Sequence, residues 1–402
     1  MTRRNIHSGE MTRAIHAGEA PDPATGASAP AIHMSSTFVS DSVAGFSAHD
    51  LGEESPYLYA RWANPSVRML ERKIAALQGT EDCLCTASGM AAAAAILLTF
   101  LSQGDHLVIS DVTYAGVAEL ARDTLPRYGV AVTPVDMSDL AAVAAAIRPE
   151  TRLVHVESPV NPILRLTDIA AVARLAHEAG ALVSADATFA SPLGLDAGAL
   201  GVDLVMHSTT KYIGGHGDAV GGAVAGRADL VKRMRLEAGI HHGGVLSPFN
   251  AWLIARGAAT LPLRMRAHAA GAQAVAEWLE SRAAVTRVIY PGLPSHPQHD
   301  LARAQMRGFS GMLSFQVGDV ATGERIARAM IERLQVVHYA VSLGHHRSLI
   351  FWMETAGLME TSFRLEGAAL ESYRAFAGEG IFRMSVGLED AEDSIADLAQ
   401  VL

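Results

Sequence analysis

The sequence of 402 residues contains only two cysteines, Cys83 and Cys85, which stand two positions apart in an alternating run. As strand residues they would point to the same face and could not readily bridge each other, which disfavours a disulfide between them. A Cys-x-Cys metal site would need two further ligands nearby, and none is evident. We therefore expect two buried thiols.

Long hydrophobic runs and clusters of basic residues are also lacking. The longest apolar run, Met90 to Leu101, has the length of a buried helix and falls short of a bilayer span. The formal net charge is -10 and the basic residues are scattered, which disfavours a nucleic-acid or anionic-membrane partner. The N-terminus lacks the apolar core of a signal sequence, so we expect a cytoplasmic protein.

The length of the chain exceeds what one hydrophobic core usually supports, while half of the residues are apolar and available for burial. Residues 1–63 show little hydrophobic periodicity, and such an arm often packs on another subunit. We expect this arm to be followed by a large α/β domain over 64–255 and a smaller α+β domain over 256–402.

Within the large domain, β-type and α-type patterns alternate repeatedly. This alternation predicts a mainly parallel, seven-stranded sheet that is covered on both faces. The expected strands are Asp82 to Thr86, His106 to Ser110, Val130 to Val135, Arg152 to Glu157, Ala181 to Asp186, Asp203 to His207 and Val220 to Ala225. In the C-terminal domain we expect strands near Arg287 to Tyr290, Gly311 to Val317 and Ile381 to Ser385.

Two strands of the large domain end abruptly in polar residues, one at Asp186 and one in the turn Ser208-Thr-Thr-Lys211. Because ligands bind outside the carboxyl ends of strands in such sheets, these residues should converge. Pyridoxal phosphate needs a lysine amine, a carboxylate for its ring nitrogen, and donors for its phosphate. The sequence offers each of these groups: the amine of Lys211, the carboxylate of Asp186, and the hydroxyl donors of Ser208 and Thr210. Alone, however, a lysine after a strand is commonly a solvated surface residue.

The run Asp203-Leu-Val-Met-His-Ser-Thr-Thr-Lys-Tyr-Ile-Gly-Gly-His-Gly-Asp218 resembles the lysine signature of the pyridoxal-phosphate enzymes of cysteine and methionine metabolism. That family includes cystathionine γ-lyase, methionine γ-lyase and cystathionine γ-synthase, and the resemblance extends from about Thr12 to the last residue. It implies the aspartate-aminotransferase-like fold, fold type I. It also implies that Lys211 binds the cofactor covalently.

The same resemblance assigns a phosphate site after the first strand, at Ser88-Gly89-Met90. A serine is a good N-cap, and the free amides at a helix N-terminus bind anions. Such a motif alone is commonly a plain helix cap. Its register with the family pattern makes Gly89 and Met90 the expected phosphate-binding amides.

Two further positions match family residues at the edge of the sheet. Tyr114 matches the tyrosine that stacks on the cofactor ring, and a phenol there can also carry protons to a leaving group. Asn161 matches a residue that hydrogen-bonds the ring oxygen of the cofactor or the substrate carboxylate.

The remaining matches concern the substrate anchor and a neighbouring subunit. Arg383 falls on the arginine that binds the substrate carboxylate, with Ser342 nearby. Tyr59 and Arg61 match a Tyr-x-Arg motif that reaches the phosphate in the adjacent subunit. This implies a catalytic dimer, and two such dimers in a homotetramer.

The chain departs from its relatives at positions that bear on the substrate. Methionine γ-lyases carry a cysteine at the position of Gly116 and a Lys-Asp pair at Ile240-His241, which disfavours a dedicated methionine γ-lyase. Cystathionine-handling members have a glutamate aligned with Arg347. Within the divergent segment 345–370, Glu354 and Glu360 either face a cationic substrate tail or are solvated.

The expected reaction is therefore γ-elimination from a γ-substituted L-amino acid such as methionine, homocysteine, cystathionine or canavanine. The alternative within the class is γ-replacement, as in cystathionine γ-synthase or an O-acylhomoserine sulfhydrylase. A catalytically silent relative that serves as a binding protein is the alternative outside it. We expect no metal, since the pairs His241-His242, His296 with His299, and His345-His346 lack a helix-borne His-Glu-x-x-His motif.

Overall fold

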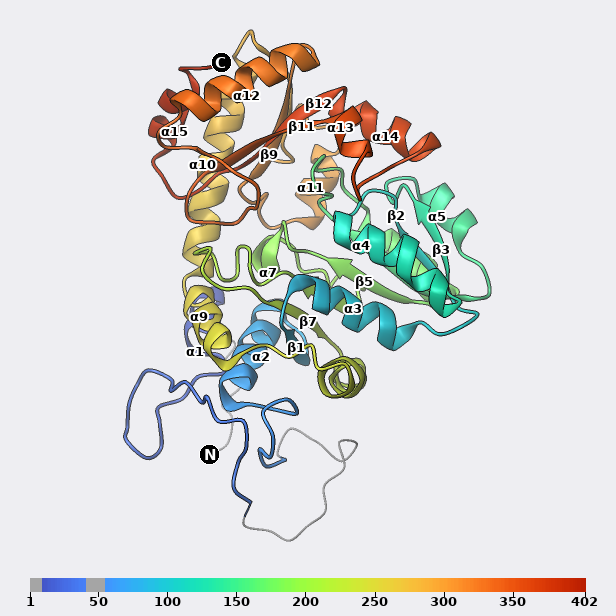
Figure 1. The fold of residues 1–402 in the computed structure, drawn as a ribbon, viewed down its shortest axis with the longest axis vertical. Helices are drawn as coiled ribbons and strands as arrows, with labels where there is room; N and C mark the ends of the chain where they lie inside the picture. The colour runs from blue at the N-terminus through green and yellow to red at the C-terminus, as the bar shows by residue number, and fades with distance from the viewer. Residues whose placement is uncertain (1–8, 41–54) are drawn as a thin grey trace.

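The computed structural model describes residues 9–40 and 55–402, and it contains two sheets with helices packed around each (Figure 1). The larger sheet has the strand order β1-β7-β6-β5-β4-β2-β3. Its strands are β1 (Asp82–Thr86), β2 (His106–Ser110), β3 (Ala131–Val135), β4 (Thr151–Glu157), β5 (Leu182–Asp186), β6 (Leu204–His207) and β7 (Gly222–Gly226). Each lies within two residues of its predicted position.

The strands of the large sheet are parallel except β7, which runs antiparallel to β1 and β6. The predicted mainly parallel, seven-stranded sheet is thereby confirmed. Parallel pairing brings the carboxyl ends of β2, β4, β5 and β6 to one edge, and that edge faces the second sheet (Figure 1). The polar residues that end these strands therefore meet at this edge.

Helices cover both faces of the large sheet. Along β2, Leu107 and Ile109 pack towards α3 while Val108 packs towards α6, as the alternation of a strand requires. The first face carries α3 (Gly89–Phe100), α4 (Ala115–Glu119), η2 (Leu120–Thr124), η3 (Leu125–Tyr128), α8 (Ala228–Met234) and η4 (Arg235–His241). The opposite face carries α2 (Pro65–Gln78), α5 (Leu140–Ala146), α6 (Ile169–Glu178), α7 (Ser191–Gly194) and α9 (Pro248–Ala258).

In the described part of the N-terminal arm the first element is a short helix, α1 (Glu10–His16), that the sequence pattern did not predict. Ala14 of this helix is buried, and the amine of Lys73 on α2 donates to the carbonyl of Ala14 at 2.6 Å. Lys73 also pairs with Glu19 at 2.9 Å. These contacts attach α1 and Glu19 to helix α2 of the same chain.

The smaller sheet has the order β10-β11-β12-β9-β8. Residues Phe315, Trp352 and Phe382 form its aromatic core, with ring centroids 4.8 to 5.1 Å apart in the two pairs that share Phe382. Its strands are β8 (Val285–Ile289), β9 (Met312–Val317), β10 (His338–Tyr339), β11 (Leu349–Glu354) and β12 (Gly380–Ser385). Its helices are α10 (Leu261–Glu280), α11 (His299–Gln305), α12 (Val320–Arg333), α13 (Thr355–Met359), α14 (Gly367–Ala377) and α15 (Ala391–Leu398).

The three strands expected in the C-terminal region correspond to β8, β9 and β12, whereas β10 and β11 were not predicted. Helices α10, α12 and α15 cover one face of this sheet, and its other face turns towards the large domain (Figure 1). The division of the chain at 255/256 remains our proposal; that point falls inside α9.

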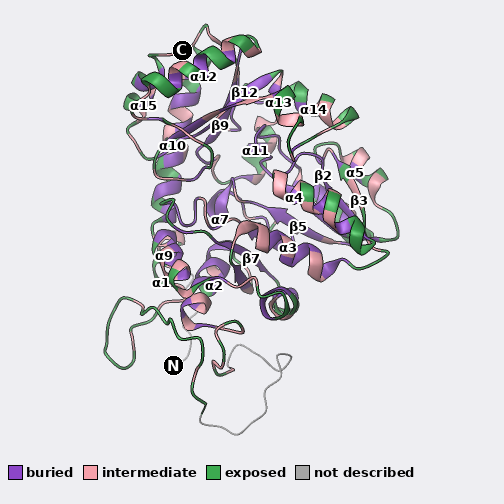
Figure 2. Ribbon diagram, in the orientation of Figure 1, coloured by how far each residue is buried: buried purple, intermediate pink, exposed green. Residues whose placement is uncertain are grey.

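Buried residues concentrate on the strands of both sheets, and exposed residues lie on the outer sides of the helices (Figure 2). Cys83 and Cys85 are free and buried, as expected from β1. Over residues 9–40 and 55–402, no helix combines the length and the apolar character needed to cross a membrane.

Candidate active site

A cavity of about 460 Å³ lies between the carboxyl edge of the large sheet and the inner face of the smaller one. Eleven of the thirteen predicted site residues line it. They are Ser88, Gly89, Met90, Tyr114, Asn161, Asp186, Ser208, Thr210, Lys211, Ser342 and Arg383. Residues that are up to 295 positions apart in the sequence therefore share one space, because parallel strands end at a common edge.

Lys211 lies in the turn that follows β6, and its backbone amide donates to the carbonyl of Ser208 at 3.1 Å. Its amine donates to the hydroxyl of Ser342 at 2.9 Å. Burial lowers the pKa of Lys211, and the nearby guanidinium of Arg383 lowers it further. A lower pKa increases the fraction of neutral amine, which is the form that can act as nucleophile or base.

Arg264 of α10 holds the backbone just after Lys211, a role that sequence reasoning missed. Its guanidinium donates to the carbonyls of Tyr212 at 2.7 Å and Ile213 at 3.2 Å. Gly344 packs against the same turn from the other domain with φ of +70°, and a Cβ there would lie 2.5 Å from the Tyr212 nitrogen. The position of Lys211 thus depends on contacts from both halves of the molecule.

Asp186 ends β5 and is buried at the base of the cavity, where it accepts from the backbone amide of Thr188 at 2.9 Å. Burial raises the pKa of Asp186. Glu157, at the end of the adjacent strand β4, is buried too; burial and the charge of Asp186 raise its pKa to about 8. Two neighbouring buried carboxyls favour a cation between or beside them.

Glu157 was not among the predicted site residues, yet it connects three parts of the site. One oxygen accepts from the hydroxyl of Thr113 and from the amide of Tyr114, both at 2.7 Å. The other accepts from the amide of Asn161 at 2.8 Å. The available signal was an acid that ends a buried apolar strand, directly beside the strand that ends in Asp186.

The predicted phosphate site has the required backbone arrangement. Ser88 caps α3 by accepting from the amide of Ala91 at 3.1 Å, and Gly89 and Met90 begin that helix. A Cβ at Gly89 would lie 2.9 Å from the Cβ of Ser208, so only glycine permits this close approach. The hydroxyl of Thr210 already bonds the backbone of Gly221, donating to its carbonyl at 3.1 Å.

Arg383 on β12 faces the cavity from the smaller sheet. Its guanidinium donates to the side-chain oxygen of Asn161 at 3.0 Å and to the carbonyl of Ser342 at 3.1 Å. Both contacts hold the fork in place, and the one to Asn161 connects the smaller sheet with the edge of the large sheet across the cavity. Tyr114 is 49% exposed, so its ring is available for contact with a ligand.

The distal wall of the cavity is apolar. Phe351 and Met353 of β11 line it, and Phe351 lies directly opposite Arg383 in the strand pairing. Glu354 and Glu360 are not among the lining residues; Glu360 instead lines a separate hollow with Glu119 and Arg122. The idea that these acids form a cationic-tail pocket is therefore not supported by their positions. Strand alternation separates Glu354 from Phe351 and Met353.

Tyr59 and Arg61 do not line the cavity of their own chain. Arg61 donates to the carbonyl of Ile240, and its guanidinium lies 5.4 Å from the ring centre of Tyr59. Tyr59 is 45% exposed. These positions fit a role outside their own site, which remains a prediction.

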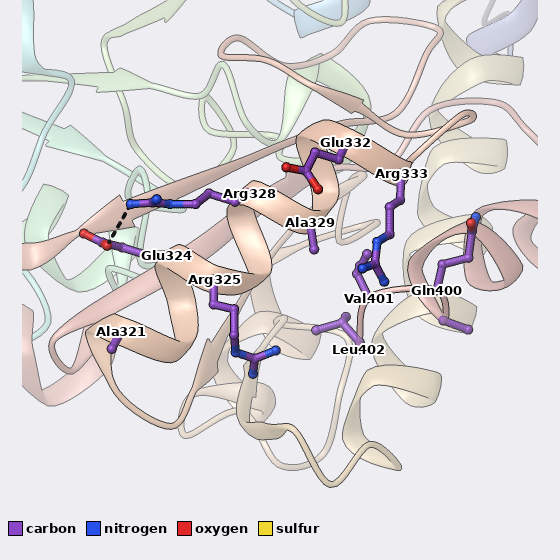
Figure 3. Close-up of a pocket in the computed structure, with 11 residues that line it drawn as sticks. Ala321, Glu324, Arg325, Arg328, Ala329, Glu332, Arg333, Gln400, Val401 and Leu402 are labelled. Carbon is purple, nitrogen blue, oxygen red and sulfur yellow. Dashed lines mark ion pairs between the residues drawn. The ribbon is translucent and has the colours of Figure 1, made fainter.

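Another large hollow lies on the outer side of the smaller domain, between α12 and the chain end (Figure 3). Arg325, Arg328 and Arg333 line it, and Arg328 pairs with Glu324 at 3.6 Å. All of these charged side chains are exposed and the hollow is open, which is typical of a solvated helix face. It shares no residue with the cavity at the sheet edge.

The histidine pairs do not form a metal site in the part of the chain that is described. No three His, Cys, Asp or Glu side chains gather there in a group that could hold a metal ion. The rings of His345 and His346 stack at 4.3 Å, and His296 contacts a backbone carbonyl.

The cavity suits pyridoxal phosphate on structural grounds. Burial raises the pKa of Asp186, and a protonated ring nitrogen beside it would stabilise its carboxylate and lower that pKa. Because Gly89 has no side chain, its backbone lies close to Ser208, and the amides at this helix N-terminus can bind a phosphate there. The amine of Lys211, with its lowered pKa, lies in the same cavity.

Comparison with known proteins supplies independent information. The family model described as Cys/Met metabolism PLP-dependent enzyme matches residues 11–402. A canavanine gamma-lyase of Rhizobium leguminosarum bv. trifolii is 42% identical over 97% of this chain and 95% of its own length. A cystathionine gamma-synthase of Mycobacterium bovis is 43% identical over 98% of this chain and 97% of its own. The crystal structure of metB from Corynebacterium glutamicum is 36% identical, covers 98% of both chains and superposes with a TM-score of 0.88.

Proposed function

Because the chain belongs to the Cys/Met metabolism PLP-dependent enzyme family, we propose that it catalyses γ-elimination. The enzyme acts on γ-substituted L-amino acids, has the type I fold and depends on pyridoxal phosphate. In the proposed reaction the γ substituent leaves with a proton, and water hydrolyses the remainder to ammonia and a 2-oxo acid. One observation carries the proposal: the amine of Lys211, the ring of Tyr114 and the fork of Arg383 line one cavity with an apolar distal wall.

Residues of this chain suit each part of the cofactor. Lys211 would hold its aldehyde carbon, Asp186 its ring nitrogen, and Tyr114 one face of its ring. Its phosphate would be held by a group of backbone amides and hydroxyls, namely Ser88, Gly89, Met90, Ser208 and Thr210. When bound, pyridoxal phosphate supplies an electron sink for the charge that develops on the substrate.

The substrate is positioned and its protons are moved by three side chains. Arg383 binds the α-carboxylate with its planar fork, which Asn161 and Ser342 hold in orientation. The amine of Lys211 removes the proton at Cα and then acts at Cβ. The phenol of Tyr114 donates a proton to the leaving group at the γ position.

The charges in the cavity favour a substrate without a second carboxylate, which argues against replacement by cysteine and against a succinylated substrate. Among the described residues that line it, Arg383 is the one arginine and Lys211 the one lysine. Replacement by cysteine, or a succinylated substrate, would bring a second carboxylate into the cavity. That carboxylate would meet Phe351 and Met353 and find no cation in this chain, and an unpaired buried carboxylate is costly.

A substrate panel tests the proposal. Purified enzyme is incubated with methionine, homocysteine, cystathionine, an acylhomoserine and canavanine, with and without an added thiol. Release of 2-oxo acid and ammonia without thiol is the expected result. Product that forms only when thiol is present would establish γ-replacement and overturn γ-elimination.

We further propose that the working unit is a dimer, paired into a homotetramer. Tyr59 and Arg61 lie outside the cavity of their own chain, and Tyr59 is exposed. In the proposed dimer they act on the phosphate bound by the neighbouring subunit. A solution mass equal to one chain would contradict this assembly.

A further inference from the structure

Four charged side chains of the described residues line the active-site cavity, namely Glu157, Asp186, Lys211 and Arg383. In the proposed reaction the last three contact the cofactor or the substrate, which leaves the part of Glu157 to be explained. Glu157 is 4% exposed and ends β4 directly beside Asp186 of β5. Burial of a carboxylate is costly, so its contacts must compensate for the loss of water.

The two oxygens of Glu157 hold two different loops. Oε2 accepts from the hydroxyl of Thr113 and from the backbone amide of Tyr114, both at 2.7 Å, in the loop after β2. Oε1 accepts from the backbone amide of Asn161 at 2.8 Å, in the loop after β4. Tyr114 and Asn161 both line the cavity, so each oxygen positions a different part of its wall.

These two loops act at opposite ends of the substrate. The side-chain oxygen of Asn161 accepts from the guanidinium of Arg383 at 3.0 Å, and Arg383 binds the α-carboxylate in the proposed reaction. The phenol of Tyr114 acts at the γ substituent. The carboxylate of Glu157 therefore connects the group that orients the substrate carboxylate with the group that acts on the leaving group.

The bond from Tyr114 to Glu157 also ties helix α4 to the edge of the large sheet. Tyr114 is the N-cap of α4, and its side chain makes no capping hydrogen bond. Its carbonyl accepts from the amides of Val117 at 2.8 Å and Ala118 at 3.0 Å, within the start of the helix. Its own amide donates in the opposite direction, to Glu157. The position of the half-exposed Tyr114 ring thus depends on this carboxylate.

The contacts of Glu157 suit its ionised form, because a backbone amide can only donate a hydrogen bond. Burial and the charge of Asp186 act against ionisation and raise the pKa of Glu157 to about 8. A cation beside Asp186, such as the protonated ring nitrogen of the cofactor, would lower the pKa of Glu157 as well. The experiments below therefore use cofactor-loaded enzyme at about pH 9, where the carboxylate is mostly ionised.

We propose that Glu157 is a positioning residue whose two oxygens separately hold the acid Tyr114 and, through Asn161, the substrate anchor Arg383. The inference rests on the proposed function and adds to it a separate role for each oxygen. Loss of the Oε1 contact should weaken substrate binding, and loss of an Oε2 contact should slow the reaction of bound substrate. A purely structural role would not separate these two effects.

Glu157→Gln tests the role of Oε1, because an amide keeps one acceptor oxygen and replaces the other with an NH₂ group. The remaining oxygen should face Thr113 and Tyr114, where two donors meet, so the amide of Asn161 loses its partner. L-norleucine has the shape of methionine and no leaving group. We expect its affinity, measured by titration of the cofactor absorbance, to fall about tenfold, since a buried donor is left unpaired.

Glu178→Gln is the matched control, since Glu178 lies exposed at the end of α6. It should bind L-norleucine with wild-type affinity. Wild-type affinity in Glu157→Gln would overturn the role of Oε1. L-norleucine cannot undergo elimination or replacement, so this result does not depend on which reaction the enzyme catalyses. If the wild-type enzyme did not bind L-norleucine, the proposed function itself would fail, and this inference with it.

Thr113→Val and Thr113→Ser test the role of Oε2. Valine has the shape of threonine without the hydroxyl, whereas serine keeps the hydroxyl and lacks the methyl group. Thr113→Val should lower kcat about fivefold, the value of one net hydrogen bond, and leave L-norleucine affinity within about twofold of wild type. Thr113→Ser should restore kcat to within about twofold of wild type.

The Thr113 pair also decides the matter if Glu157→Gln does not take up cofactor. Turnover is measured with saturating substrate, with a thiol added if the enzyme requires one. Equal kcat in Thr113→Val and Thr113→Ser would overturn the role of Oε2. A loss of L-norleucine affinity in Thr113→Val as large as its loss of kcat would show that the two oxygens have no separate roles, and would overturn the proposal.

Discussion

The two walls of the active-site cavity differ in chemistry: one carries the ionisable residues, and the other carries apolar side chains. The wall at the edge of the large sheet is polar, and Lys211, Asp186 and Glu157 in it all have shifted pKa values. The opposite wall on β11 consists of Phe351 and Met353. The difference indicates that reaction chemistry and substrate choice reside on separate elements.

The two sides of the cavity are also joined by hydrogen bonds, one from Lys211 to Ser342 at 2.9 Å and one from Arg383 to Asn161. Arg383 lies opposite Phe351 in the β11–β12 pairing and bonds Asn161 of the polar wall at 3.0 Å. The substrate carboxylate, held at Arg383, would therefore fix where the rest of the substrate lies against each wall. Substitutions on either side should then have separable effects.

The largest effect is expected at Lys211 on the polar wall. The chain contains three lysines, and Lys232 is exposed while Lys73 is buried against Glu19. Lys211→Ala should reduce turnover by about three orders of magnitude or more, the range seen when a catalytic nucleophile is removed. Lys232→Ala is the control and should be fully active. Peptide mass mapping after borohydride reduction checks the attachment point, and a modified Lys73 or Lys232 would refute it.

The next largest effect is expected at Asp186. Asp186→Asn retains the size of the side chain and removes the charge that would keep the ring nitrogen protonated. We expect turnover to fall by about a hundredfold, equivalent to roughly 3 kcal/mol, with little change in KM. Circular dichroism shows whether the fold is retained. Normal turnover in this variant would rule out the electron-sink role of Asp186.

A mixing experiment tests whether the polar wall is completed by a second subunit. Arg61→Ala and Lys211→Ala chains should each have low activity alone. Mixed under conditions that exchange subunits, they should recover part of the wild-type activity, since one hybrid site would contain both native groups. Failure to recover, when exchange is demonstrated with labelled chains, would count against a shared site.

The pH dependence of stability should report on Glu157. Its folded pKa of about 8 lies above the ordinary value of 4.5 for a glutamate, so the folded state binds the extra proton more tightly. Stability without added cofactor should therefore fall as pH rises from 4.5 towards 8. Glu157→Gln should flatten that slope in urea unfolding. An unchanged slope would mean that Glu157 is ionised across this range.

The smallest effects are expected on the apolar wall. Phe351→Ala should change the ratio of kcat/KM for methionine and canavanine by about tenfold, because a large contact surface at the distal wall is lost. Glu354→Gln and Glu360→Gln should leave that ratio unchanged, since neither acid lines the cavity. A changed ratio in either Gln variant would restore the acidic-pocket hypothesis.

The sequence by itself determined the large sheet and most of the polar wall. Strands such as Asp203 to His207 are short apolar runs that end in turn residues, and this signal is local. Once the sheet is parallel, the ends of its strands must share an edge, so Asp186 and Lys211 could be placed together without coordinates. The family motif then predicted Tyr114 and Arg383, and both line the cavity.

Only the tertiary structure decided which residues complete the site. The carboxylate of Glu157 accepts hydrogen bonds from Thr113, Tyr114 and Asn161. These three donors meet only because the loops after β2 and β4 lie next to each other in the folded chain. The side of β11 that faces the substrate is set by its pairing with β12, so Phe351 rather than Glu354 lines the cavity. Such contacts join residues far apart in the chain, and no local pattern encodes them.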